Sequence, residues 1–146
     1  SAGTPDQMAG SDMTYNEGTH VELQNDPITF GSVYAGTDDN LNTNSPAFAL
    51  RNCGNVVLNS TVTGANITDG GVNSIAAGQF SVRDVADAVA RLTLTEGAQD
   101  FSKPSGIAVS TGTPVDWEVK SYANVPIGQA QATYNTGTWA FIVSKY

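Results

Sequence analysis

The chain has 146 residues, a length typical of one domain with a buried core. Gly, Ser, Thr and Asn account for 55 residues but Lys and Glu for only seven, which excludes a bundle of long, solvent-exposed helices. A net charge of −8 with six basic residues excludes the positive surface that binds nucleic acid. No apolar run approaches the roughly 18 residues of a membrane span, so we expect a soluble, mostly β domain.

The acidic charge is concentrated near the N-terminus. Residues 1–40 hold seven of the 14 acidic residues and none of the six basic ones. Such asymmetry indicates a separate functional unit. We therefore divide the chain into residues 1–27, a flexible leader with an extended strand, and residues 28–146, a β-sandwich domain. The sequence begins without Met, and we expect an extracellular or cell-surface protein whose signal peptide has been removed.

Residues 13–24 alternate apolar and polar side chains, the pattern of a β-strand with one apolar face. Pro27 ends the pattern because proline cannot donate a hydrogen bond to a β-ladder. The face consists of Met13, Tyr15, Thr19, Val21 and Leu23, and only Glu17 interrupts it.

The rest of the chain reads as short strands separated by turns rich in Gly, Pro and Asn. We expect strands at residues 28–30, 48–52, 56–62, 80–82, 107–109, 115–119 and 138–143, and polar loops at 38–46 and 124–129. Residues 84–92 have helical spacing and predict a short helical turn that leads into a strand. The pattern predicts an all-β fold, a single jelly-roll or Ig-like β-sandwich of about seven to nine strands.

The residues favour a protein without catalytic, cofactor or metal sites. His20 is the one histidine, and the chain has neither a Gly-x-Ser-x-Gly elbow nor a phosphate-binding glycine loop. One histidine and one cysteine are too few for a zinc or iron–sulfur site. Cys53 has no partner for an intrachain disulfide, and we expect it to be a small buried hydrophobic residue.

Two features allow more than one interpretation. Asp38 and Asp39 could supply oxygen ligands to Ca²⁺, but a hydrophilic loop tip is the favoured interpretation. Asn59 and Asn66 each begin an N-glycosylation sequon, and such triplets also arise by chance in an Asn- and Thr-rich chain.

Several segments together resemble a known family. These are ITFGSVYAG at residues 28–36, FALRNCGNVVL at 48–58, VPIGQA at 125–130 and YNTGTW at 134–139. They are similar to segments of secreted β-sandwich proteins of the TasA/camelysin type and of archaeal bundling-pilus subunits. In that family an entry strand reaches a Gly turn, a second strand ends in an Asn-x-Gly-Asn corner, and a late Pro-x-Gly loop precedes the closing strand.

The resemblance implies a structural subunit of an extracellular filament or pilus, a head-to-tail homopolymer built by donor-strand complementation. Such a fibre would serve adhesion, cell bundling or a biofilm matrix, with other cells or fibres as further partners. Residues 13–24 suit the donor role because a strand with one apolar face can complete a neighbour's open sheet. Two alternatives stay open: these residues pair within their own sandwich, or the chain is a monomeric Ig-like surface module that binds glycans.

Overall fold

The computed structural model describes residues 17–24, 27–44, 48–86, 90–113 and 116–146. These residues form short strands and one single-turn 3₁₀ helix, η1 (Ala77–Gln79). The strands are β1 (Val21–Gln24), β2 (Thr37–Leu41), β3 (Phe48–Asn52), β4 (Leu58–Thr63), β5 (Ile67–Thr68), β6 (Ser74–Ile75), β7 (Phe80–Asp84), β8 (Leu92–Thr93), β9 (Ala98–Asp100), β10 (Asp116–Val125) and β11 (Ala140–Lys145).

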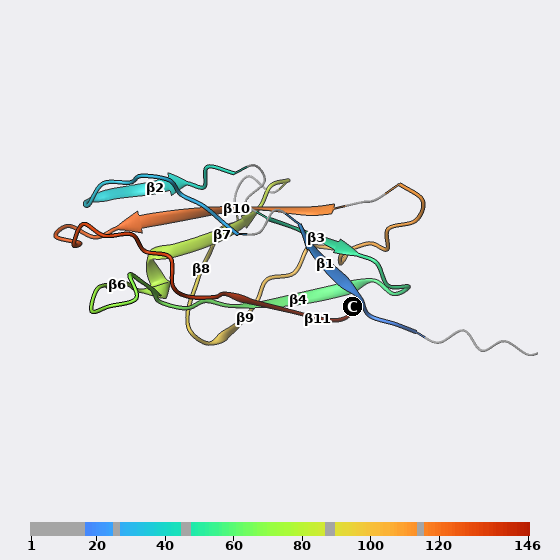
Figure 1. Ribbon diagram of the computed structural model, residues 1–146. Coiled ribbons are helices and arrows are strands. Elements are labelled where there is room, and N and C mark those ends of the chain that lie inside the picture. The colour runs from blue at the N-terminus through green and yellow to red at the C-terminus, as the bar shows by residue number, and fades with distance from the viewer. Residues whose placement is uncertain (1–16, 25–26, 45–47, 87–89, 114–115) are drawn as a thin grey trace, which may run out of the picture.

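The strands make two facing layers, which confirms the predicted all-β, sandwich-like fold (Figure 1). The larger sheet has the order β1-β3-β10-β7-β8, and β2 pairs with the second half of β10. The smaller sheet has the order β11-β4-β9, and β5 and β6 form a separate hairpin. All these pairings are antiparallel.

Period-2 alternation decides which side chains fill the space between the sheets. In β4, Leu58, Ser60 and Val62 are buried and the residues between them are half-exposed. The ten residues of β10 alternate in the same way from Trp117 onward. Aromatic rings join the layers, and the Phe48 and Phe141 centroids lie 4.5 Å apart.

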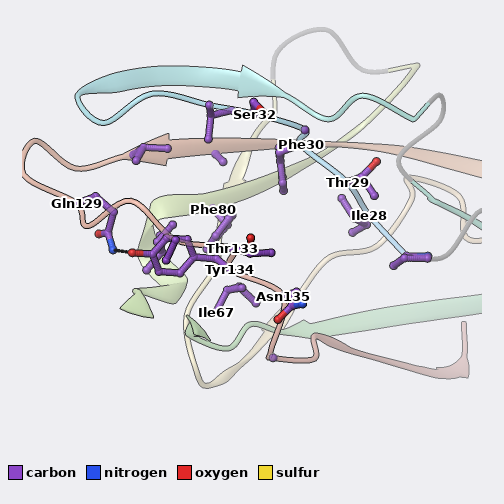
Figure 2. Close-up of a pocket in the computed structure, with 18 of the residues that line it drawn as sticks. Ile28, Thr29, Phe30, Ser32, Ile67, Phe80, Gln129, Thr133, Tyr134 and Asn135 are labelled. Carbon is purple, nitrogen blue, oxygen red and sulfur yellow. Dashed lines mark hydrogen bonds between the residues drawn. The ribbon is translucent and has the colours of Figure 1, made fainter. Parts of the chain in front are cut away.

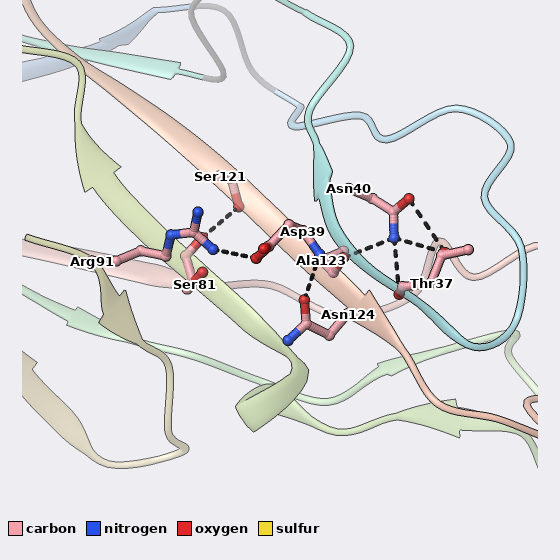
Figure 3. Close-up of polar contacts among 8 residues, drawn as sticks. All are labelled: Thr37, Asp39, Asn40, Ser81, Arg91, Ser121, Ala123 and Asn124. Carbon is pink, nitrogen blue, oxygen red and sulfur yellow. Dashed lines mark hydrogen bonds and ion pairs between the residues drawn. The ribbon is translucent and has the colours of Figure 1, made fainter. Parts of the chain in front are cut away.

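The structure corrects the prediction of a polar loop at residues 38–46, because Thr37–Leu41 is the strand β2. Its polar side chains satisfy the pairing at a bulge opposite Ala123 and Val125. The Asn40 side-chain amide donates to the Ala123 carbonyl at 2.9 Å and to the Thr37 hydroxyl at 3.0 Å (Figure 3). A strand held by side-chain amides lacks the apolar alternation by which strands are recognised in sequence.

Several other predicted elements differ from the structure or lie partly outside the described residues. Residues 28–30 are irregular, and residues 107–109 contribute only the isolated bridge between Ile107 and Leu58. The predicted helical turn at 84–92 falls partly outside the described residues, and Asp84 and Leu92 belong to β7 and β8. The short strand β9 has no apolar pattern and was not predicted.

Candidate functional site

An open groove of about 1160 Å³ lies between the two layers. Residues 27–35 form one wall, and residues 129–135 with 137–139 form the other. Its floor includes core side chains from both sheets, among them Phe48, Phe80 and Phe141. Figure 2 shows Phe30 and Ile28 reaching toward the groove from one side and Tyr134 and Ile67 from the other.

The floor of the groove is apolar because aromatic residues there continue the hydrophobic core outward. Phe30 and Trp139 pack on either side of Phe80, with ring centroids 5.9 Å and 5.4 Å from the Phe80 ring. Phe80 is buried, whereas Phe30 and Trp139 are only partly buried against the core. The core is therefore incompletely covered at this place.

Both walls of the groove carry unpaired backbone. No hydrogen bond connects the backbone of residues 30–33, or that of residues 131–133, to any other part of the chain that the structure describes. Neither run belongs to a strand. Unpaired backbone beside an apolar surface is the feature of a sheet edge that accepts an added strand.

One wall is fastened to the hairpin by a small polar cluster. The Gln129 side-chain amide donates to the Tyr134 hydroxyl at 2.6 Å and to the Ser74 carbonyl at 3.1 Å. The Tyr134 hydroxyl in turn donates to the Ala130 carbonyl at 2.7 Å. These bonds join the two ends of the run 129–134 to each other (Figure 2) and connect Gln129 to β6.

Exposed apolar side chains occupy the loops at one end of the molecule. Tyr34 precedes β2, Ile127 follows β10 and Val72 lies between β5 and β6; their exposed fractions are 80%, 91% and 98%. Figure 1 shows these three loops at the same end, opposite the end at which the described chain begins.

The predicted donor residues divide into two groups. Met13 and Tyr15 lie outside the described residues. Thr19, Val21 and Leu23 lie against their own subunit, because β1 pairs with β3 in the register Val21 to Asn52 and Leu23 to Leu50. For residues 17–24 the structure thus has the in-chain pairing that sequence analysis gave as the alternative.

The segment before β1 is also bound to its own domain. The amide N–H groups of Cys53 and Asn55 donate to the carbonyls of His20 and Gly18 at 2.9 Å and 3.1 Å. Glu17 pairs with Lys145 near the C-terminus, at 2.6 Å and 2.7 Å. Gly54 permits this approach, since a Cβ atom there would lie 2.3 Å from the Gly18 carbonyl oxygen.

Cys53 is exposed, which corrects the prediction of a buried residue. It follows the last residue of β3, and the turn there directs it toward β1 rather than into the core. Partial desolvation by its surroundings raises the pKa of the thiol, and the nearby Glu22 carboxylate raises it further. The structure also brings His20 and Glu22 close to Cys53, and these three residue types can bind a metal ion. Sequence analysis had excluded a metal site because it counted only one histidine and one cysteine. The register of β1 on β3, which a sequence pattern does not give, creates this cluster.

Asp38 and Asp39 lie in β2 and not at a loop tip. The Asp39 backbone has a φ of 57° and its N–H donates to Asn124 at 2.8 Å. Its carboxylate pairs with Arg91 at 2.5 Å (Figure 3), and the Arg91 guanidinium lies 3.7 Å from the centre of the Tyr122 ring. Among the described residues, neither aspartate belongs to a group of three or more potential metal ligands.

The two sequons lie in different surroundings. Asn59 is half-exposed in the central strand of the smaller sheet, where it faces away from the core between Leu58 and Ser60. Asn66 is exposed, and its side-chain oxygen accepts a hydrogen bond from the Ala77 N–H at 2.9 Å. Their glycosylation stays a prediction.

Among the residues that the structure describes, no helix is long and apolar enough to cross a membrane. Comparison with protein-family models, with curated proteins and with solved structures finds no match to this chain.

Proposed function

We propose that the chain is a non-enzymatic structural subunit whose groove accepts the N-terminal segment of another copy, so that subunits join head to tail into an extracellular filament. The observation that carries the proposal is the open groove, which has an apolar floor and unpaired backbone on both walls. An incoming strand would cover the partly buried rings of Phe30 and Trp139 and would pair with the walls.

The in-chain pairing of β1 narrows the donor to the residues before it. Residues 17–24 anchor the segment to its own subunit, and Met13 and Tyr15 become the apolar anchors that enter a neighbour. Residues 1–16 reach about 50 Å when extended, at roughly 3.3 Å per residue. This length suffices to enter a second subunit.

Side-chain burial alone does not hold such a joint. Burying Met13 and Tyr15 contributes about 1.5–3 kcal/mol each. Ordering each residue of the donor costs about 1–2 kcal/mol, so a strand of eight residues costs more than its two anchors contribute. Hydrogen bonds to both walls must supply the difference, which is why unpaired backbone matters as much as the apolar surface.

The two ends of the subunit differ, which favours an open chain over a closed pair. The described chain begins at one end, beside Lys145, and the exposed apolar loops lie at the other (Figure 1). A contact between two different surfaces is heterologous, and such contacts build filaments when the rotation between subunits does not close a ring.

The test uses two isoleucine variants of the full chain. Ile28 is partly buried and lines the groove, whereas Ile142 is 62% exposed and does not line it. We expect wild type and Ile142→Asp to form filaments visible by negative-stain microscopy, and Ile28→Asp to stay monomeric with an unchanged circular dichroism spectrum. Filaments of a folded Ile28→Asp variant would contradict the proposal. A wild type that is monomeric at all concentrations would favour the monomeric binding module.

A further inference from the structure

We infer that His20, Glu22 and Cys53 form a binding site for a divalent transition metal of the zinc class, which fastens β1 to the turn after β3. One ligand atom from each of the three side chains lies within 4.8 Å of the other two. The site is separate from the groove, and metal binding there does not depend on the proposed function.

The pairing of β1 with β3 brings the three side chains together. Val21 pairs with Asn52, so the preceding residue, His20, lies opposite Cys53, whose N–H donates to the His20 carbonyl at 2.9 Å. Glu22 is two residues from His20 and therefore lies on the same face of the strand. The His20 Nε2 and Glu22 Oε1 atoms are 4.0 Å apart.

These donors suit zinc in kind and number. An imidazole nitrogen, a thiolate and a carboxylate oxygen are the three ligand types that zinc binds, at about 2.0–2.3 Å. A tetrahedral site with such bonds separates its ligands by about 3.3–3.8 Å. All three side chains are exposed, so rotations at their surface can close the remaining gap, and water would fill the fourth position.

The surrounding charges permit a cation. Arg51 pairs with Glu22 across the ladder, but its guanidinium is bound by both carboxylate oxygens of Asp116, at 2.7 Å and 3.0 Å. The positive charge of Arg51 is therefore largely compensated by the Asp116 carboxylate. On binding, the metal takes the place of the Cys53 thiol proton, which is released to solvent.

A metal at this site would act as a clamp. Two of its ligands lie in residues 20–22 and the third in the turn that follows β3, so removing β1 from the sheet would require loss of the metal. If the proposed function holds, the same metal fixes the point from which residues 1–16 leave the subunit.

The test titrates the reduced full-length chain with Co²⁺, whose bond to a thiolate gives a charge-transfer absorption. We expect one Co²⁺ per chain, an intense visible spectrum typical of a tetrahedral site, and displacement by Zn²⁺. Cys53→Ser should abolish the charge-transfer band, and His20→Asn should weaken Zn²⁺ binding at least about tenfold. Glu22→Gln should also weaken Zn²⁺ binding, whereas Glu96→Gln, its matched control at an exposed glutamate remote in sequence, should bind Zn²⁺ like wild type.

A second readout separates ligand loss from misfolding. Zn²⁺ should slow alkylation of Cys53 in wild type and in Glu96→Gln, but not in His20→Asn, while the circular dichroism spectra of all three agree. No charge-transfer band, a band that His20→Asn leaves unchanged, or one Co²⁺ shared by two chains would each overturn the inference. None of these results would bear on whether the groove accepts a strand.

Discussion

Asn52 shows how one buried polar side chain can fix a corner of the fold. It is fully buried, and its amide donates to the carbonyls of Val56 and Ile107 at 2.8 Å and 2.9 Å. Its side-chain oxygen accepts the Gly54 N–H at 3.0 Å. The side chain thus satisfies three backbone groups where β3 turns toward β4, and this turn carries Cys53.

Asn52→Ala should lower the free energy of unfolding by about 2–4 kcal/mol, since it leaves buried backbone groups without partners at about 1–3 kcal/mol each. Chemical denaturation followed by circular dichroism measures the change. Asn59→Ala, which removes a half-exposed asparagine from β4, should change the stability by less than about 0.5 kcal/mol. Equal losses in the two variants would mean that the Asn52 bonds do not hold the corner.

Single residues also mark where sequence analysis succeeds and fails. The Asn-x-Gly-Asn corner ends β3 as predicted, because its residue types are those a turn requires. The prediction that Cys53 is buried rests on its residue type alone. Its exposed position beside β1 depends on the register of β1 against β3. Register is set by tertiary packing, which a local pattern does not contain.

At the scale of an element, the β5–β6 hairpin supports one end of the groove through Ile67 and Ile75. Its turn is organised by Asp69, whose carboxylate accepts the Gly71 N–H and the Asn73 side-chain amide, both at 2.7 Å. The bond from the Asn73 side chain, followed by that from the Gly71 backbone, lowers the pKa of Asp69 from its ordinary value of 3.8.

A lowered pKa in the folded state means that the ionised Asp69 carboxylate stabilises the fold. This contribution is fully present above pH 3.8 and is lost as the pH falls through the lowered pKa of the folded state. Asp69→Asn should therefore be less stable than wild type at neutral pH, and this difference in stability should shrink below pH 3.8. Thermal melts across pH 2–7 measure it, with Asp38→Asn, an exposed aspartate, as control. A difference independent of pH would contradict this role of the charge.

Elements built on apolar alternation were predictable, and those built on polar pairing were not. Trp139, Phe141 and Val143 alternate along the strand expected at residues 138–143, and all three are partly buried against the core. β2 was not predicted because two Asn side chains, Asn40 in β2 and Asn124 in β10, bond to the backbone of the opposite strand, and a sequence rich in Asn and Asp is typical of a loop.

At the scale of the molecule, the groove is a property of two segments that lack strand structure. The sequence predicts strands or loops for residues 27–35 and 129–139. No local sequence pattern indicates that these two segments face each other across an apolar floor. Composition and the spacing of turns predict the β-sandwich class. They do not predict that the backbone of the groove walls stays unpaired, because this depends on which strands pair with each other. β1 pairs with β3 at the edge of its own sheet, and our proposal therefore takes the residues before Glu17 as the donor.

A mixing experiment shows whether the N-terminal residues of one copy fill the groove of another copy. Ile28→Asp blocks the groove but keeps the donor, whereas a Met13→Asp/Tyr15→Asp variant blocks the donor but keeps the groove. The variant Thr14→Asp/Asn16→Asp, with the same added charge on the opposite face of the segment, is the control and should assemble like wild type.

Analytical ultracentrifugation of the two blocked variants gives the decisive measurement. Each variant alone should sediment as a monomer, and their equimolar mixture should form a 1:1 dimer that grows no further, because it contains one intact donor and one intact groove. A mixture that stays monomeric, or either variant polymerising alone, would contradict the account.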